Sequence, residues 1–109
     1  MSIRLFTDRT DETVVSLSKA IEAIEAESWR EGNFVGFTND LDETLQFIRV
    51  EQDEWLVDVP VYVGRKYANY SMKSIATTLQ VKQMSKLFFE AGDWKRVVDL
   101  EDSRISERF

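Results

Sequence analysis

The chain has 109 residues, of which 43% are hydrophobic, 31% charged and 12% aromatic, and its net charge is -6. A chain of this length removes on the order of 65% of its unfolded surface from water on folding. The sequence has no cysteine and no histidine, which excludes disulfides, thiolate and imidazole metal ligands, and the commonest general base. We therefore expect one folded domain over residues 1–109, a non-enzymatic function, and no cofactor.

No segment predicts a signal peptide or a membrane span. The first ten residues carry charge at Arg4, Asp8 and Arg9, and the longest apolar run covers only residues 59–63. Such a run is too short for the apolar region of a signal peptide or for a transmembrane helix. The expected location is the cytoplasm, with no membrane partner.

Helical periodicity marks residues 11–28 as the first element. Val14, Leu17 and Ile21 recur at the spacing of one helix face. Thr10 is the expected N-cap, because its hydroxyl can accept a hydrogen bond from a free backbone N–H at the start of the helix.

After Gly32 the apolar period changes to two. This pattern predicts three consecutive antiparallel strands at residues 33–37, 44–50 and 55–63. The third strand gives the sharpest signal, because its odd-numbered residues are apolar and predict a core face. Pro60 cannot donate a ladder hydrogen bond, so this strand should lie at a sheet edge or carry a bulge there.

A second helix is expected over residues 80–91, after a change of phase near residue 77, and Gly92 should end it. Residues 93–100 favour a fourth strand over a helix, and residues 103–109 are expected to form a mobile tail. The predicted order α-β-β-β-α-β corresponds to an α+β fold. It would consist of a mostly antiparallel sheet of three to four strands with helices packed on one face.

Negative charge is concentrated in the first half of the chain. Residues 1–58 hold 14 acidic and 5 basic residues, for a net charge of -9, whereas residues 59–109 carry +3. Two acidic turns, at residues 40–43 and 51–54, flank one predicted strand and should lie at its opposite ends. An acidic surface accelerates association with a basic partner by electrostatic steering.

These turns predict a binding site for a protein partner with a basic surface. The aromatic ring of Trp55, beside the second turn, would be an anchor for that partner, although its place on the core face of the strand leaves burial equally open. The predicted partner-binding residues are Asp40, Asp42, Glu43, Asp53, Glu54 and Trp55.

Two other acidic patterns have ordinary structural interpretations. Residues 40–51 match part of the spacing of a calcium-binding EF-hand loop, but Leu45 stands where that loop needs glycine. We therefore expect a solvated acidic turn and no metal. Asp58, in the third predicted strand, is expected to pair with Arg49 of the neighbouring strand.

Nucleic-acid binding is an alternative function that the sequence disfavours. Within residues 62–86, cations such as Arg65, Lys66 and Lys73 alternate with Tyr67 and Tyr70, which suits phosphate contacts and base stacking. The overall negative charge opposes a polyanion, because like charges repel.

Self-assembly as a structural or accessory subunit, of the phage or plasmid type, is another alternative. A long strand over residues 55–63 at a sheet edge would pair with a second copy across a two-fold axis and form a homodimer.

The segment at residues 87–100, LFFEAGDWKRVVDL, resembles the helix, glycine and final strand of small acidic immunity proteins that protect bacteria from secreted polymorphic toxins. The resemblance implies a non-enzymatic, cytoplasmic α+β protein that neutralises a toxin by covering its active site. Because those families share no binding motif, no residue role is transferred. An immunity or inhibitor protein is thus the most concrete form of the predicted binding function.

Overall fold

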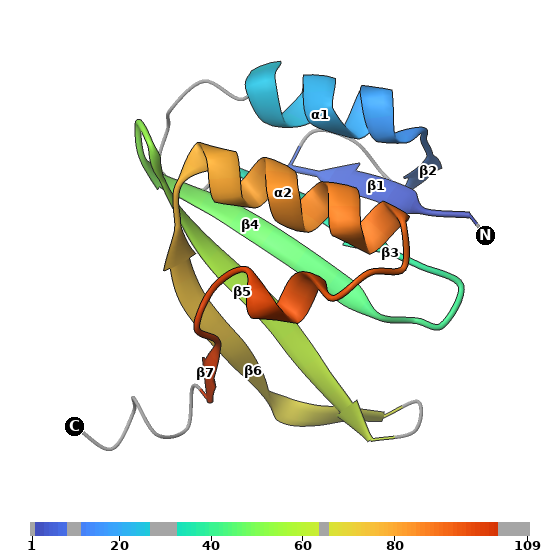
Figure 1. Ribbon diagram of the computed structural model, residues 1–109. Helices are drawn as coiled ribbons and strands as arrows, with labels where there is room; N and C mark the ends of the chain where they lie inside the picture. Colours follow the sequence, from blue (N-terminus) through green and yellow to red (C-terminus); the bar gives the residue numbers. More distant parts are fainter. Residues whose placement is uncertain (1, 9–11, 27–32, 64–65, 103–109) are drawn as a thin grey trace.

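The computed structural model describes residues 2–8, 12–26, 33–63 and 66–102. The strands are β1 (Arg4–Thr7), β2 (Thr13–Val14), β3 (Phe34–Thr38), β4 (Thr44–Glu51), β5 (Glu54–Val63), β6 (Lys66–Ala76) and β7 (Glu101–Asp102). The helices are α1 (Leu17–Ala26), α2 (Thr78–Phe89) and the short 3₁₀ helix η1 (Trp94–Arg96). In the described residues all seven strands form one antiparallel sheet, in the order β2-β1-β3-β4-β5-β6-β7 (Figure 1).

The predicted fold class is therefore wrong. Seven strands rather than three to four make up the described sheet, and two of them precede the first helix. The expected helix over residues 11–28 is divided, because Thr13 and Val14 pair with β1 and α1 begins only at Leu17. The predicted N-cap Thr10 lies outside the described residues. The three predicted strands are confirmed, since β3, β4 and β5 match them within one residue at each end.

The second half of the chain also differs from the prediction. β6 was not predicted as a strand, because its polar and apolar residues do not alternate cleanly. α2 begins two residues earlier than expected because Thr77 and Gln80 cap it reciprocally. The Thr77 hydroxyl accepts from the Gln80 N–H (3.2 Å), and the Gln80 side chain accepts from the Thr77 N–H (2.9 Å).

The predicted strand at residues 93–100 is absent, and η1 occupies the start of that segment. Trp94 is buried and packs edge-on against Phe88, with ring centroids 5.3 Å apart. This anchor holds the chain against α2 instead of extending it along the sheet. The last described strand, β7, follows only at Glu101–Asp102, and the predicted mobile tail at residues 103–109 lies outside the described residues.

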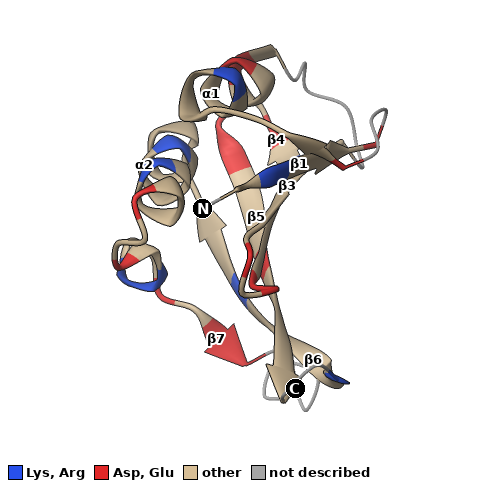
Figure 2. Cartoon of the chain, turned by 90° about the vertical axis from the view of Figure 1, so that its right-hand side faces the viewer, with Lys and Arg blue, Asp and Glu red and all other residues tan. Residues whose placement is uncertain are grey.

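The core lies between the sheet and the two helices, which pack side by side (Figure 2). We call the sheet face that contributes to this core the inner face and the opposite face the outer face. Trp55, Val57 and Val59 of β5 are buried on the inner face, which confirms the predicted core face of that strand. The helices contribute Ala20, Ile24, Val81, Met84 and Phe88 to the core.

Pro60 marks an irregularity between β5 and β6. Pro60 lies opposite Ser71, and the next recorded pair is Tyr62 opposite Tyr67. β6 therefore contains two more residues than β5 in this interval. Asn69, within it, adopts a positive φ of 65°. The additional residues therefore lie in β6 and not in β5. β5 is an interior strand of the sheet, but among the described residues its pairing with β4 ends at Asp58, so Pro60 has a paired neighbour only on the β6 side.

Beyond this bulge the two strands form an arm, defined here as residues 61–63 and 66–70, that projects past the end of β4 (Figure 1). The pairing of β4 with β5 ends at Gln46 opposite Asp58. The Tyr62 and Tyr67 rings pack on the arm with centroids 5.9 Å apart, and each residue is more than 40% exposed.

A close approach of two strands explains Gly36 on the outer face. Phe6 of β1 is the register partner of Gly36 in β3, and a Cβ at residue 36 would overlap the far end of the Phe6 ring. The same ring packs against Phe34, with centroids 6.2 Å apart. The glycine therefore makes room for an aromatic pair.

The substitution Gly36→Ala should lower the free energy of unfolding by about 1–3 kcal/mol, because the new methyl group displaces the Phe6 ring. In a Phe6→Ala background the same change should cost less, with a coupling of at least about 0.5 kcal/mol in a double-mutant cycle. Urea denaturation of the four proteins measures this coupling. Strictly additive effects would show that the ring does not restrict residue 36.

Candidate functional site

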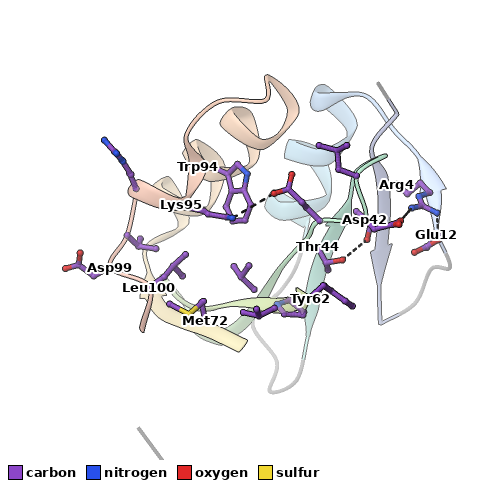
Figure 3. A pocket seen from close by; sticks show the side chains of 18 residues that line it. Arg4, Glu12, Asp42, Thr44, Tyr62, Met72, Trp94, Lys95, Asp99 and Leu100 are labelled. Atoms are coloured by element: carbon purple, nitrogen blue, oxygen red, sulfur yellow. Dashed lines mark hydrogen bonds and ion pairs between the residues drawn. The ribbon is translucent and has the colours of Figure 1, made fainter. Parts of the chain in front are cut away.

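An open groove of about 1080 Å³ lies where the β5–β6 arm leaves the sheet (Figure 3). Thr38 and Pro60 reach it from the outer face, whereas Val59 and Met72 reach it from the inner face. The cavity therefore passes the end of the β4–β5 ladder and opens to both faces. Its apolar lining consists of Leu41, Val59, Pro60, Val61, Met72, Trp94, Val98 and Leu100.

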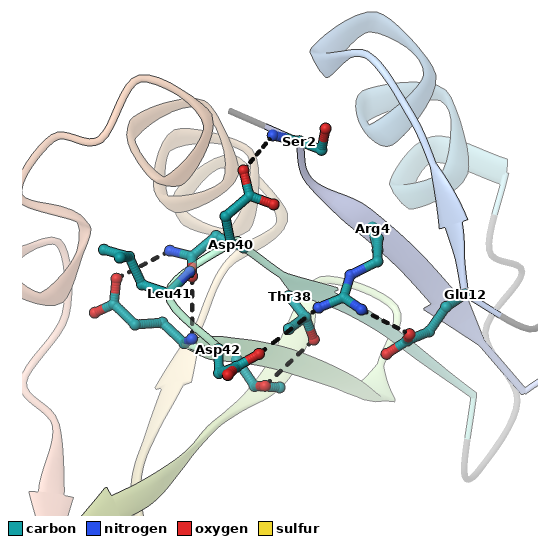
Figure 4. A network of polar contacts seen from close by, with 10 residues as sticks. Ser2, Arg4, Glu12, Thr38, Asp40, Leu41 and Asp42 are labelled. Atoms are coloured by element: carbon teal, nitrogen blue, oxygen red, sulfur yellow. Dashed lines mark hydrogen bonds and ion pairs between the residues drawn. The ribbon is translucent and has the colours of Figure 1, made fainter. Parts of the chain in front are cut away.

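Ion pairs form much of the groove rim. The Arg4 guanidinium lies 3.3 Å from the Glu12 carboxylate and 3.9 Å from that of Asp42 (Figure 4). On the other wall, the Lys95 ammonium lies 3.9 Å from the Glu43 carboxylate and 5.3 Å from the centre of the Trp94 ring. These pairs join β1, the turn between β3 and β4, and η1 around the groove.

The turn between β3 and β4, residues 39–43, is held by one buried side chain. The Asn39 Oδ1 atom accepts hydrogen bonds from the N–H groups of Leu41 (2.9 Å) and Glu43 (3.0 Å). Its Nδ2 atom donates to the Glu43 carboxylate (2.9 Å). Asp42 adopts a φ of 61°, which aspartate tolerates better than most residues. The acidic turn is thus locally fixed.

The structure separates the six predicted partner-binding residues into two groups. Asp40, Asp42 and Glu43 lie in the first turn, whereas Asp53 and Glu54 lie at the other end of β4, about 26 Å away for eight residues of strand. This confirms that the acidic turns occupy opposite ends of one strand. Asp42 and Glu43 line the groove, and Asp40, beside it, accepts a hydrogen bond from the Ser2 N–H (2.8 Å; Figure 4).

Asp53 and Trp55 instead hold the start of α2 against the sheet. The Asp53 carboxylate accepts from the Thr78 N–H (2.9 Å). Trp55 is fully buried, its indole N–H donates to the Thr78 hydroxyl (3.0 Å), and the Arg49 guanidinium lies 5.0 Å from its ring centre. Hydrogen bonds from the Thr78 side chain and backbone lower the pKa of Asp53. The contacts of Asp53 and Trp55 therefore stabilise the fold. In this group of predicted partner-binding residues, Glu54 is exposed and has no such contact among the described residues.

The predicted pair between Asp58 and Arg49 is wrong. Asp58 lies opposite Gln46 and Lys73, whereas Arg49 lies opposite Trp55. Because neighbouring positions on a strand point to opposite faces, Arg49 projects to the inner face and Asp58 to the outer face.

The described cations of the basic tyrosine-containing segment lie on two elements, β6 and α2. Lys66 and Tyr67 lie on the arm, and Lys73 lies in the sheet. On α2, Lys82 pairs with Glu25 of α1 (3.0 Å) and Lys86 with Glu90 (4.0 Å). Arg65 lies outside the described residues. The described cations are thus divided between β6 and α2, and the two on α2 pair with carboxylates.

Most of the groove was not identifiable from sequence. Arg4, Met72 and Leu100 lie far apart in the chain and meet only through the sheet order. One local signal existed in Leu41, an apolar residue between two aspartates in a turn, and the structure leaves it 72% exposed.

Comparisons with protein-family models, curated proteins and solved structures give no match to this chain. None of the helices in the described part of the chain has the length and apolar character needed to cross a membrane. Within the same residues no group of three or more Asp or Glu side chains is placed to hold a metal ion. Functional inference therefore rests on the groove and its charges.

Replacing Trp55 with alanine should lower the free energy of unfolding by about 3–5 kcal/mol, because a buried ring and its hydrogen bond to Thr78 are lost. Chemical denaturation measures this change. A loss below about 1 kcal/mol would place the indole at the surface, as an anchor for a partner requires.

Asp53→Ala should lower the melting temperature at neutral pH, and the difference from wild type should shrink in acid. The folded protein favours the ionised carboxylate, since the pKa of Asp53 lies below its usual value of 3.8. Its stabilising effect is complete above that value and is lost as the pH falls through the lower, folded-state pKa. Thermal denaturation across acidic pH measures the effect, and a difference that stays constant with pH would contradict this role.

Proposed function

We propose that this chain is a non-enzymatic protein-binding module whose partner presents a basic surface, with an immunity or inhibitor role as its most concrete form. The observation that most supports this proposal is the groove of about 1080 Å³, which has an apolar floor and a charged rim. An apolar centre surrounded by polar groups is typical of protein interfaces. This volume lies just above the roughly 300–1,000 Å³ that is typical of small-molecule pockets.

The acidic turn supports this proposal because it is fixed before any partner binds. Asn39 is buried and holds both Leu41 and Glu43 through hydrogen bonds. A preorganised turn loses little conformational entropy on binding. Its exposed Leu41 offers an apolar contact between two carboxylates.

Accessible carboxylates at the groove favour a cationic partner. The Asp42 side chain is 72% exposed and lies 3.9 Å from Arg4, at the limit of an ion pair. Asp99 has no cation within ion-pair distance among the described residues. With a net charge of -6 on the chain, such a surface accelerates encounters with a basic protein, and salt weakens the effect.

The polar groups of the groove suit recognition better than catalysis. A covalent or acid–base mechanism needs a nucleophile and a base within hydrogen-bond distance of each other. Here Arg4 and Lys95 pair with carboxylates instead, and the sequence has neither histidine nor cysteine.

An immunity role agrees with the acidity of the chain. The segment at residues 87–100 supports it by sequence resemblance alone, because residues 93–100 form no final strand. Part of that segment, including Trp94, Lys95 and Asp99, lines the groove. A protein that covers the cationic active site of a toxin needs an acidic, preorganised surface of this kind.

Self-association is a second candidate function, favoured by the exposed arm. Tyr62, Tyr67 and Val63 are 44%, 43% and 74% exposed, and such a cluster suits contact with another copy. Because β4 and β6 flank β5 as far as Asp58, residues 55–58 are not available for pairing with that copy. Static light scattering at high micromolar concentration should show a monomer, whereas a dimer would favour this second candidate.

The first proposal is tested by capturing partner proteins from an extract of the source cell at low and moderate salt. One variant combines Asp42→Asn, Glu43→Gln and Asp99→Asn at the groove. Its control combines Glu22→Gln, Glu51→Gln and Glu90→Gln, which removes the same charge at exposed positions outside the groove.

The groove variant should lose about tenfold or more of the captured partner at low salt, which corresponds to about 1.4 kcal/mol. The control should retain most of it, because net charge alone does not place a partner at the groove. Equal losses in both variants, or no partner at either salt concentration, would contradict the proposal.

A further inference from the structure

Beyond Asp58 no residue of β5 pairs with β4 among the described residues, and this edge of β5 borders the groove. Pairing with β4 ends at Gln46 opposite Asp58, and residues 59–62 line the cavity. Because that cavity opens to both faces of the sheet, open space separates this edge from the turn at residues 39–43. In an antiparallel ladder, backbone N–H and C=O groups point alternately to the two sides of a strand. The even-numbered residues of β5 point towards β4, so Pro60, which offers only its C=O, and Tyr62, which offers both its N–H and C=O, face the groove.

We propose that the partner polypeptide inserts an extended, basic segment into the groove and pairs it with residues 59–63 of β5 as an added strand. This inference rests on the proposed function and specifies its binding mode. In strand addition, main-chain hydrogen bonds supply affinity, and contacts to alternate side chains supply specificity. A partner bound in this way extends the sheet where β4 has turned away.

The two sides of the groove predict the side-chain pattern of the inserted segment. Towards the inner face it would meet the apolar groups of Val61, Met72 and Leu100. Towards the outer face it would meet Thr44 and the Tyr62 ring, half exposed on the arm. Since successive side chains of a strand point to opposite faces, apolar residues should alternate with polar or aromatic ones.

Charge complementarity selects a basic segment. The groove lining includes four carboxylates, of Glu12, Asp42, Glu43 and Asp99, and three cations, of Arg4, Lys95 and Arg96. Each cation already has a carboxylate within 4.0 Å, because Arg96 pairs with Asp93 at 2.9 Å. Among the described residues no cation pairs with Asp99, so its carboxylate can receive a lysine or arginine of the partner, whereas an acidic segment would face repulsion from it.

A second copy of this chain fits the groove less well than a basic partner. Two molecules that each carry a net charge of -6 repel each other.

The test uses a phage-displayed library of random twelve-residue peptides, selected on the full chain. Each enriched peptide is then synthesised in two forms. One form carries backbone N-methyl groups on the odd-numbered residues, and the other carries them on the even-numbered residues. Only one edge of an added strand faces β5, so one methylation pattern should weaken binding at least about tenfold and the other should not. The enriched sequences should contain lysine or arginine within an alternating apolar pattern.

Two protein variants locate the site. Val61→Asp places a charge on the groove floor, and Ile75→Asp is its matched control on the outer face, where Ile75 is 53% exposed. Val61→Asp should weaken peptide binding at least about tenfold, and Ile75→Asp should not. Circular dichroism melting confirms that both variants fold. If Val61→Asp does not fold, Asp99→Asn replaces it, and it should weaken binding of the basic peptides.

Each contrary outcome has a separate meaning. Peptides that depend on Val61 but tolerate both methylation patterns would overturn strand addition and leave the proposed function intact. Failure to enrich any peptide would likewise overturn only this inference, because a folded partner can still dock on the rim in the capture experiment. Dimerisation that Val61→Asp abolishes would identify a second copy as the occupant and would also overturn it.

Discussion

The end of the ladder between β4 and β5 is the constraint on which the groove depends. The two strands pair as far as Gln46 and Asp58. Two positions later, Pro60 has no N–H to continue a ladder, and the bulge in β6 lies opposite the same point. Because β4 turns away here while β5 continues, an arm leaves the sheet and a cavity opens beside it (Figures 1 and 3).

The two acidic turns differ in role because they lie at opposite ends of β4. Thr78 bonds to the carboxylate of Asp53 and to the indole of Trp55. These bonds join the second turn to the beginning of α2, so its aspartate serves the fold. In the first turn Asn39 fixes the backbone, and the carboxylates of Asp42 and Glu43 remain at the groove rim. Similar composition therefore yields one turn that is bonded to α2 and one turn whose carboxylates lie at the groove.

Sequence patterns predicted the elements whose signals are local. Strict alternation in β5 identified its core face, because it follows from the strand's own residues, and Pro60 marked the point where pairing becomes irregular, although the additional residues lie in β6. β6 has no such alternation, and β1 and β2 are too short to show a period. The segment after Gly92 was misassigned because Trp94 packs against Phe88. For the site, charge identified both acidic turns, but their roles depend on Thr78 and on the sheet order, which are not local to either turn.

Nuclear magnetic resonance of the free protein tests the central claim most directly, through backbone nuclear Overhauser effects between β4 and β5. The structure predicts cross-strand Overhauser effects between the paired residues of the two strands, from the pair Arg49 and Trp55 to the pair Gln46 and Asp58. It predicts none between residues 41–43 and residues 61–63, where the groove lies. Continuous cross-strand effects between those two segments would contradict the account. They would show that pairing closes the groove and leaves no strand edge for a partner.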